Sequence, residues 1–227
     1  MFLEGFLRRK EIKVVHAGRP LERYEALMAG KVACVGLMEP WITLAEKNGW
    51  FLAQQFENEA NPAYHRNTTA AEILRDFANQ RLDFFVSGWG TGGTLTGVSQ
   101  VLKVARPDIT IIGTEPAGAS MVGGADWAPH MIQGWTPDFL PEVFDTSVID
   151  DLTPVTDQEA ISTALDLAKK EGIFCGISSG GTFAAALKTA ESAPEGSTIL
   201  AMLPDTGERY LSTPLFAEIN TGNDEVE

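Results

Sequence analysis

The chain has 227 residues, of which 44% are apolar and 21% are charged, with 22 glycines and 12 prolines. This composition is that of a globular protein and excludes the collagen-like, low-complexity and wholly disordered classes. Acidic residues outnumber basic ones by 31 to 17, for a net charge of −14. Because such a surface repels phosphate backbones and anionic lipids, we expect no nucleic acid and no membrane as a partner.

The sequence also bears on cellular context and on metals. The first residues do not form a signal peptide, because Glu4 interrupts their very short apolar stretch. No uncharged apolar run approaches the roughly 18 residues of a membrane span, so we predict a cytoplasmic protein. The two cysteines, Cys34 and Cys175, are far apart, and the three histidines do not cluster with them. We therefore expect neither a disulfide nor a metal site.

Short β-branched runs alternate with amphipathic segments along the chain. The runs predict strands at Ile12–Val15, Val32–Leu37, Trp50–Ala53, Leu82–Ser87, Ile109–Thr114, Ile173–Cys175 and Thr198–Leu203. The segments predict helices at Leu21–Ala29, Trp41–Lys47, Thr69–Asn79, Thr94–Val104, Asp157–Glu171 and Gly181–Glu191. Strands that are continuously apolar and separated by helices are typical of a covered parallel sheet. We therefore predict the α/β class, with a mostly parallel sheet and helices on both faces.

Some helix ends have a recognisable chemical cause. Thr156 and Glu159 form a capping box at the start of one helix, and Gly172 is expected to end that helix. Gly30 and Gly49 are expected to end the two N-terminal helices in the same way. From Pro116 to Pro154 there is no clean periodicity, and a connection that long inside a compact domain is usually functional.

The strongest local motif is the glycine- and threonine-rich segment Gly88–Thr94, which lies between a predicted strand and a predicted helix. Glycines let the backbone turn sharply and bring N–H groups against a phosphate, and the helix N-terminus adds a partial positive charge. Two ligands fit this motif. As a G-x-G-x-x-G fingerprint with Glu115 at the next strand end, it predicts a dinucleotide such as NAD. The hydroxyls of Thr91 and Thr94 favour a phosphate monoester instead.

Further motifs accompany Gly88–Thr94 and the Leu95–Val98 that follows it. They are Gln54–Pro62 with His65 and Thr68–Thr69, then Gln133–Phe139, Gly176–Gly180 and Leu203–Thr213. In type and order, over about residues 51–217, this set resembles the cysteine synthase (O-acetylserine sulfhydrylase) family of pyridoxal-phosphate enzymes. The resemblance implies the cofactor-phosphate half of a fold-type II pyridoxal-phosphate enzyme.

The resemblance also implies roles for individual residues. The cofactor, pyridoxal phosphate, would be bound through its phosphate by Gly90, Thr91, Gly92, Gly93 and Thr94. Ser178 would meet the pyridine nitrogen, where a neutral hydroxyl suits β-replacement better than transamination. Ser178 could also serve as a helix N-cap. Gln55 would bind the carboxylate of a small amino-acid substrate. The reaction implied is L-cysteine formation from O-acetyl-L-serine and sulfide, and a homodimer is compatible with it.

Part of the family pattern is absent from this sequence. The family's Schiff-base lysine lies in a P-x-x-S-x-K-D-R-type motif, followed by a T-S-G-N-T-G-type loop that binds the substrate carboxylate, and neither motif occurs here. We therefore assign no catalytic residue and expect an incomplete enzyme of doubtful activity. Residues 1–50 form an unmatched, βαβα-like segment, and residues 51–227 form the cofactor-binding domain. The alternatives are a dinucleotide-binding protein and a non-catalytic regulatory subunit of a full-length synthase.

Overall fold

The computed structural model describes residues 18–37 and 39–216. The chain divides between Gln55 and Phe56 into two compact units, whereas the sequence placed the boundary after residue 50. The predicted strand Ile12–Val15 lies outside the described residues. Among the described residues, no helix is long and apolar enough to cross a membrane.

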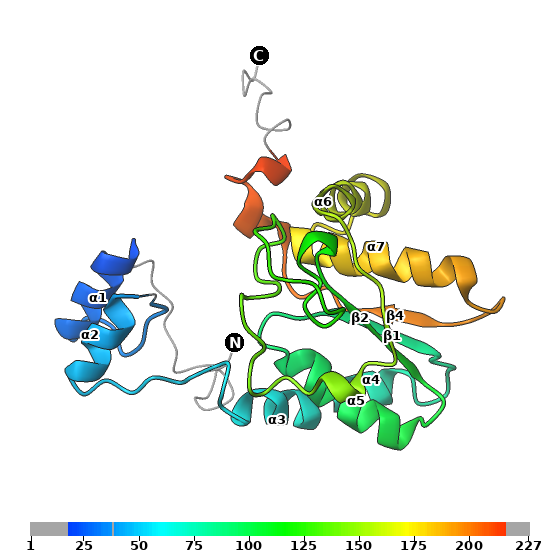
Figure 1. Ribbon diagram of the computed structural model, residues 1–227, viewed down its shortest axis with the longest axis horizontal. Coiled ribbons are helices and arrows are strands. Elements are labelled where there is room, and N and C mark those ends of the chain that lie inside the picture. The colour runs from blue at the N-terminus through cyan, green and yellow to red at the C-terminus, as the bar shows by residue number, and fades with distance from the viewer. Residues whose placement is uncertain (1–17, 38, 217–227) are drawn as a thin grey trace, which may run out of the picture. The chain divides into compact units, whose positions relative to one another are not determined.

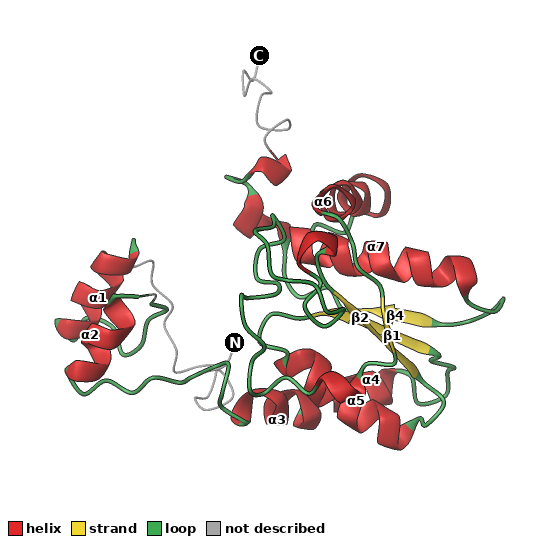
Figure 2. Ribbon diagram, in the orientation of Figure 1, coloured by secondary structure: helices red, strands yellow, loops and turns green. Residues whose placement is uncertain are grey.

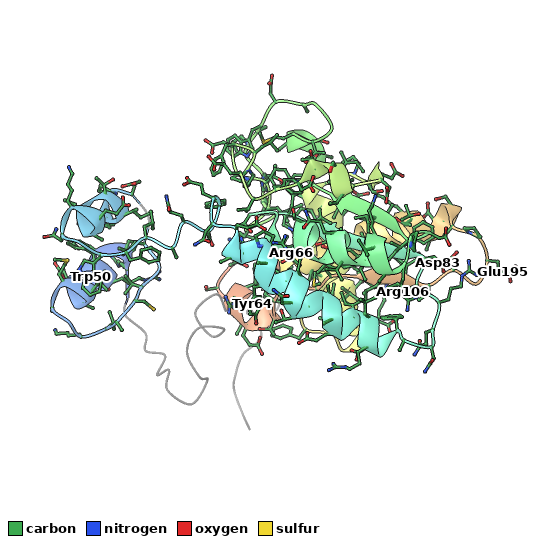
Figure 3. All side chains as sticks on the ribbon, turned by 90° about the horizontal axis from the view of Figure 1, so that it is seen from below. Trp50, Tyr64, Arg66, Asp83, Arg106 and Glu195 are labelled. Atoms are coloured by element: carbon green, nitrogen blue, oxygen red, sulfur yellow. The ribbon has the colours of Figure 1, made fainter. Side chains whose placement is uncertain are left out.

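The described part of the first unit consists of two helices, α1 (Pro20–Met28) and α2 (Trp41–Lys47). As predicted, each ends at a left-handed glycine: φ is +65° at Gly30 and +82° at Gly49. Trp50, labelled in Figure 3, then donates its backbone N–H to the carbonyl of Ala45 at 3.1 Å and closes α2.

The βαβα-like prediction for this unit is wrong where it can be compared. Residues 32–37 and 50–53 have no strand conformation. A β-branched run becomes a strand only where a neighbouring strand completes its hydrogen bonds, and the described residues of this unit contain none.

The second unit contains a parallel sheet. Its strands are β1 (Phe84–Gly88), β2 (Thr110–Thr114), β3 (Asp151–Leu152) and β4 (Ile199–Ala201), in the spatial order β3-β2-β1-β4. All three pairings are parallel. The predicted strand Ile173–Cys175 is not formed, because only Cys175 makes a bridge, to Thr206. The short strand β3 was not predicted.

Helices cover both faces of this sheet, which confirms the predicted fold class (Figures 1 and 2). On one face lie α3 (Ala60–Asn67), α4 (Thr69–Asp76) and α5 (Gly93–Ala105), of which α3 was not predicted. On the other lie α6 (Asp157–Asp166), which continues into a π-helical turn, and α7 (Ile177–Ser192). Two apolar clusters fill the layers, and successive residues of β1 serve both, since Phe85 packs into one and Val86 into the other.

The predicted ends of α6 are also confirmed. The hydroxyl oxygen of Thr156 accepts the backbone N–H of Glu159 at 3.2 Å, and a Glu159 carboxylate oxygen accepts the N–H of Thr156 at 2.7 Å. The π-helical turn after α6 stops at Gly172, which has a φ of +70°.

The beginning of the sheet is held by polar contacts. The carboxylate of Asp83, just before β1, accepts the backbone N–H of Thr198 at 2.8 Å and Nε of Arg81 at 2.7 Å. These bonds, the first most strongly, hold the pKa of Asp83 below its ordinary value. Arg106, at the end of α5, donates to the carbonyl of Gln80 at 3.0 Å and lies at the same end of the unit as Asp83 (Figure 3).

Candidate functional site

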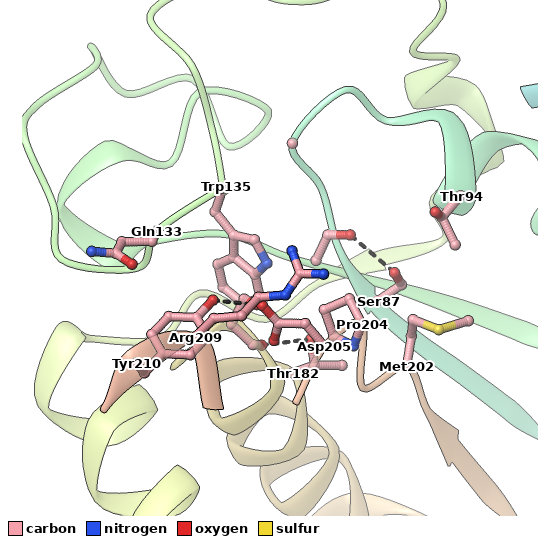
Figure 4. Close-up of a pocket in the computed structure, with 14 residues that line it drawn as sticks. Ser87, Thr94, Gln133, Trp135, Thr182, Met202, Pro204, Asp205, Arg209 and Tyr210 are labelled. Atoms are coloured by element: carbon pink, nitrogen blue, oxygen red, sulfur yellow. Dashed lines mark hydrogen bonds between the residues drawn. The ribbon is translucent and has the colours of Figure 1, made fainter. Parts of the chain in front are cut away.

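A pocket of about 410 Å³ lies beyond the carboxyl ends of β1 and β4, where parallel sheets commonly bind ligands (Figure 4). Its lining comes from the ends of these strands, the starts of α5 and α7, and two connecting segments. The lining residues are Ser87, Gly88, Gly90, Thr94, Gln133, Gly134, Trp135, Ser178, Thr182, Met202, Pro204, Asp205, Arg209 and Tyr210.

The loop between β1 and α5 needs glycines, because side chains at several of its positions would clash with neighbouring residues or disfavour the backbone conformation. Gly92 has a φ of +79°. A Cβ on Gly90 would lie 2.1 Å from the carbonyl oxygen of Gly134, and one on Gly88 would lie 2.1 Å from the Trp135 indole. No side chain caps α5, so its N-terminal partial charge is available beside the pocket.

The structure separates the predicted phosphate-loop residues into two groups. Gly90 and Thr94 line the pocket, whereas Thr91, Gly92 and Gly93 are not part of its lining. Instead, Oγ1 of Thr91 accepts Nδ2 of Asn61 at 2.9 Å and the backbone N–H of Gly93 at 3.2 Å. Thr91 therefore shapes the turn, and Thr94 is the loop hydroxyl on the pocket wall.

Thr94 is itself held from behind by a histidine of α3. Its Oγ1 lies 3.1 Å from Nε2 of His65, and Nδ1 of His65 lies 2.9 Å from Oγ1 of Thr69. Burial lowers the pKa of His65 from its ordinary value, so the imidazole is neutral in mildly alkaline solution. Sequence reasoning assigned His65 no role, although it belonged to a motif that carried the resemblance.

Ser178 lines the pocket as well, from the first turn of α7. The helix begins at Ile177 with Gly176 as its N-cap. The reading of Ser178 as an N-cap is therefore wrong, because the helix starts two residues earlier than that role requires. The Ser178 side chain is buried and contacts the hydroxyl of Tyr210.

The segment after β4 forms another wall of the pocket (Figure 4). The hydroxyl of Tyr210 donates to Oδ2 of Asp205 at 2.7 Å, while Oδ1 of Asp205 is buried without a hydrogen-bond partner. Burial, followed by the hydrogen bond to Asp205 and its charge, raises the pKa of Tyr210 to about 12. The motif Leu203–Thr213 pointed to this segment, but sequence reasoning left Asp205 open between a structural and a functional role and gave Tyr210 none.

Glu115, the residue that a dinucleotide site would require, does not face the pocket. It is fully buried. Its carboxylate accepts Nε1 of Trp89 at 3.1 Å, Oγ of Ser120 at 2.5 Å, and the backbone N–H groups of Val122 and Gly123 at 3.2 and 3.0 Å. With these donors around it, Glu115 joins segments of the protein and is not available to a ribose. The NAD alternative is therefore not favoured.

Two further sequence expectations concern residues that are not among those lining the pocket. Gln55 belongs to the first unit, and its binding of a substrate carboxylate stays a prediction. No lysine of the second unit's described residues lines the pocket. These lysines are Lys103, Lys169, Lys170 and Lys188, which lie on helices or in the π-helical turn.

The pocket fits the chemical groups of pyridoxal phosphate. The glycine turn, the start of α5 and the hydroxyl of Thr94 suit a phosphate monoester. Ser178 offers a neutral hydroxyl to a ring nitrogen, and the unpartnered Oδ1 of Asp205 is an acceptor that a ligand donor would satisfy. The fold and the pocket define the class of the protein: an α/β protein with a pocket at the carboxyl edge of a parallel sheet, lined by groups that suit a phosphate ester.

The chain belongs to the pyridoxal-phosphate-dependent enzymes. The family model described as "Pyridoxal-phosphate dependent enzyme" matches residues 14–205, a range that begins within the segment in which sequence reasoning found no resemblance to the cysteine synthases. Pyridoxal phosphate is the cofactor of this family.

Curated relatives have a cysteine-synthase-like character. The O-ureido-L-serine synthase of Streptomyces lavendulae is 59% identical over 183 residues, which are 81% of this chain and 56% of that protein. A cysteine synthase of Staphylococcus aureus is 41% identical over 191 residues, 84% of this chain and 62% of the relative. This chain thus spans less than two thirds of the length of either relative.

Solved structures agree with these relatives. The crystal structure of O-ureido-L-serine synthase superposes with a TM-score of 0.77 at 58% identity, over 81% of this chain and 58% of the other. A cysteine synthase from Entamoeba histolytica superposes with a TM-score of 0.76 at 34% identity, over 93% and 64%.

Proposed function

We propose that this chain binds pyridoxal phosphate in the pocket and supplies the cofactor-phosphate side of an enzyme that replaces the β-substituent of an activated L-serine. The observation that carries the proposal is the placement of Thr94 and Ser178 on the wall of one pocket, beside the N-termini of α5 and α7. If the phosphate is bound at the N-terminus of α5, the pyridine ring of the cofactor extends toward the N-terminus of α7.

Each residue has a task in this proposal. The backbone of the loop around Gly90 and the hydroxyl of Thr94 bind the phosphate, with Thr91, Gly92 and Gly93 holding the turn. Ser178 contacts the ring nitrogen, and the indole of Trp135 excludes water from one side of the pocket. When bound, pyridoxal phosphate supplies the electron sink for bond cleavage at the substrate.

The names of the relatives suggest the product class. Cysteine is an alanine with sulfur on its β carbon, and O-ureido-L-serine carries an oxygen-linked ureido group there. Both arise when a nucleophile replaces the β-substituent of an activated serine. We propose O-acetyl-L-serine as the amino-acid substrate, with sulfide as one nucleophile. Hydroxyurea is a second candidate, because the relative at 59% identity is named for the ureido product.

Turnover by this chain alone is a separate matter. No lysine stands in the family's Schiff-base motif, and the loop expected to orient the substrate carboxylate is absent from the sequence. We therefore expect purified protein with pyridoxal phosphate, O-acetyl-L-serine and either nucleophile to turn over far below about one per second. A rate at or above that value would contradict this expectation, and borohydride trapping with peptide mapping would then identify the lysine responsible.

Cofactor binding is tested by titrating the protein with pyridoxal phosphate and following the quenching of tryptophan fluorescence. We expect saturable binding that the double variant Thr91→Ala/Thr94→Ala weakens at least about tenfold, because the Thr94 hydrogen bond to a charged phosphate is lost and the turn held by Thr91 is loosened. Of the single variants, Thr94→Ala should have the larger effect, since Thr94 lines the pocket. Thr146→Ala/Ser162→Ala, which removes two exposed hydroxyls elsewhere, is the matched control. Unchanged affinity in the loop double variant would refute the proposal.

Assembly is tested in the same preparation. We propose a homodimer, and light scattering should give about twice the 24.5 kDa chain mass. A mass equal to one chain would contradict it without affecting the cofactor assignment.

A further inference from the structure

Helix α3 reaches the glycine loop because two glycines of α5 leave room for it. A Cβ on Gly93 would lie 2.0 Å from Oδ1 of Asn61, and one on Gly97 would lie 2.3 Å from the carbonyl oxygen of Pro62. At Gly97 the backbones of the two helices are thus in direct contact, and at Gly93 the Asn61 side chain lies against the backbone of α5. Asn61 and His65 are four residues apart and so share a face of α3, and each contacts a threonine of the loop: Asn61 contacts Thr91 and His65 contacts Thr94.

The contacts of His65 leave only two proton arrangements. A neutral imidazole has one N–H donor and one acceptor nitrogen. If the proton is on Nε2, it is donated to Thr94, and Nδ1 accepts the hydroxyl proton of Thr69. If the proton is on Nδ1, it is donated to Thr69, and Nε2 accepts the hydroxyl proton of Thr94. Burial lowers the pKa of His65 and disfavours the doubly protonated form.

The two arrangements differ in what Thr94 can offer the pocket. With the ring proton on Nε2, the Thr94 oxygen is an acceptor toward His65 and its own proton is free. With the ring proton on Nδ1, that proton is used on His65 and only lone pairs face the pocket. The phosphate monoester of pyridoxal phosphate has only acceptor oxygens above its second pKa of about 6, so it is bound by the first arrangement and repelled by the second.

We propose that His65 is a positioning residue that holds Thr94 as a hydrogen-bond donor to the cofactor phosphate, with its ring proton on Nε2 and Thr69 donating to Nδ1. This inference rests on the proposed binding of a phosphate at Gly90–Thr94. The proton state is then coupled to the ligand: an anion that binds only the Nε2–H form shifts the tautomer equilibrium toward that form.

Thr91, the other threonine of the loop, is also an acceptor toward α3. Oγ1 of Thr91 accepts from both Asn61 and the backbone of Gly93. Its proton is therefore not used on either of them. One face of α3 thus supplies donors to both loop threonines, and Thr69, at the start of α4, completes the set behind His65.

The direct test is the tautomer of His65, measured by two-bond ¹⁵N–¹H correlation on histidine-labelled full-length protein at pH 8. The His65 signal is assigned by its absence in His65→Gln. With saturating pyridoxal phosphate, whose phosphate carries no proton at this pH, we expect the proton on Nε2. A predominant Nδ1–H form, an even mixture, or a doubly protonated ring in the phosphate-bound protein would overturn the proposal.

Substitutions give an independent readout. His65→Gln places an amide donor near the position of Nε2 and should keep the Kd for pyridoxal phosphate within about twofold. His65→Ala removes the donor and should raise Kd about five- to tenfold. Thr69→Val keeps its shape but loses the hydroxyl that selects the tautomer, and should raise Kd about two- to fivefold. Tyr64→Phe, at the adjacent residue of α3 labelled in Figure 3, is the matched control.

The outcomes separate this inference from the function on which it rests. If wild-type protein binds neither pyridoxal phosphate nor inorganic phosphate, the proposed function fails. If it binds them and His65→Gln is as weak as His65→Ala, or His65→Ala is as tight as wild type, only the role of His65 is refuted. Should His65→Ala not fold, the tautomer measurement and the Thr69→Val affinity still decide.

Discussion

Two connecting segments wall the pocket, and they obtain their shapes in different ways. The loop from Gly88 to Gly93 turns within a few residues, and its own glycines permit the turn. The segment from Pro116 to Pro154 is long and is held by distant partners, as when the backbone N–H of Thr136 donates to the carbonyl of Trp89 at 2.9 Å. The first shape can be inferred from local sequence, whereas the second depends on contacts that appear only in the folded chain.

The largest effect is expected where the two segments touch. Gly90→Ala would place a Cβ 2.1 Å from the carbonyl oxygen of Gly134, and because backbone meets backbone, no side-chain rotation relieves the contact. We expect a loss of about 3 kcal/mol of unfolding free energy, measured by urea denaturation, together with weaker binding of pyridoxal phosphate. Gly118→Ala, in the long segment but with nothing within 4 Å of its Cβ, should change stability by less than about 0.5 kcal/mol. Equal effects of the two substitutions would contradict the close approach.

The next effect tests how the two segments are joined. Glu115 accepts hydrogen bonds from Trp89 of the loop and from Ser120, Val122 and Gly123 of the long segment. Glu115→Gln replaces one acceptor oxygen by a donor, so at least one of the N–H groups bound to this side chain loses its partner. We expect a loss of about 2–3 kcal/mol by the same denaturation, and no change for the exposed Glu142→Gln of the same segment. A thermal shift with NAD but not with pyridoxal phosphate would reverse this structural assignment of Glu115.

The same division, between local sequence signals and contacts of distant segments, separates the elements that the sequence predicts from those that it misses. The helix Trp41–Lys47, the strands around Phe85 and Ile111, and the capping box at Thr156 were predicted because each has a signal within a few residues. Helix α3 was missed because Pro62 reads as a helix breaker, although proline is tolerated in a first turn. The strand β3 has only two residues and exists because β2 lies beside it.

The residues of the pocket also fall into those that local motifs identified and those that they did not. Gly90, Thr94 and Ser178 line the pocket and were found from motifs. Trp135 and the pair Asp205 and Tyr210 line it too, but their motifs carried only a family resemblance and no chemistry. Their roles depend on which residues the fold brings opposite them, and local spacing does not encode that information.

A third prediction concerns the segment after β4, whose key contact is local. Asp205 and Tyr210 are five residues apart, and their hydrogen bond and charge, after burial, raise the pKa of Tyr210 to about 12. Asp205→Asn should lower the pKa of Tyr210 by at least about one unit, equivalent to ~1.4 kcal/mol. Phenolate absorbance titration measures it, with Tyr210→Phe identifying the signal. An unchanged pKa would show that burial alone causes the shift.

The sign of the accompanying stability effect follows from that direction. A raised pKa in the folded protein means that folding favours the neutral phenol. The contribution is complete below the unfolded pKa of about 10 and is lost as the pH rises through about 12. The unfolding free energy of Tyr210→Phe should therefore decrease less steeply with rising pH in this alkaline range than that of the wild type.

The smallest expected effect tests whether the long segment is strained where it meets the loop. Thr136 has a φ of +37°, which disfavours a β-branched residue, and its hydroxyl is buried without a partner. Its backbone bonds to Trp89 and Trp127 do not need the side chain. Thr136→Gly relieves the strain but loosens the unfolded chain. We expect a net gain of about 0.5–1 kcal/mol in unfolding free energy.

Thr136→Ala separates the two causes, because it removes the unpartnered hydroxyl and the branch but keeps a Cβ at positive φ. Its gain should therefore be smaller than that of Thr136→Gly. If glycine instead destabilises the protein and alanine does not, the backbone at residue 136 is unstrained. The cost of glycine would then come from the greater freedom of the unfolded chain, and the contrast of the long segment with the glycine loop could not rest on backbone strain at this position.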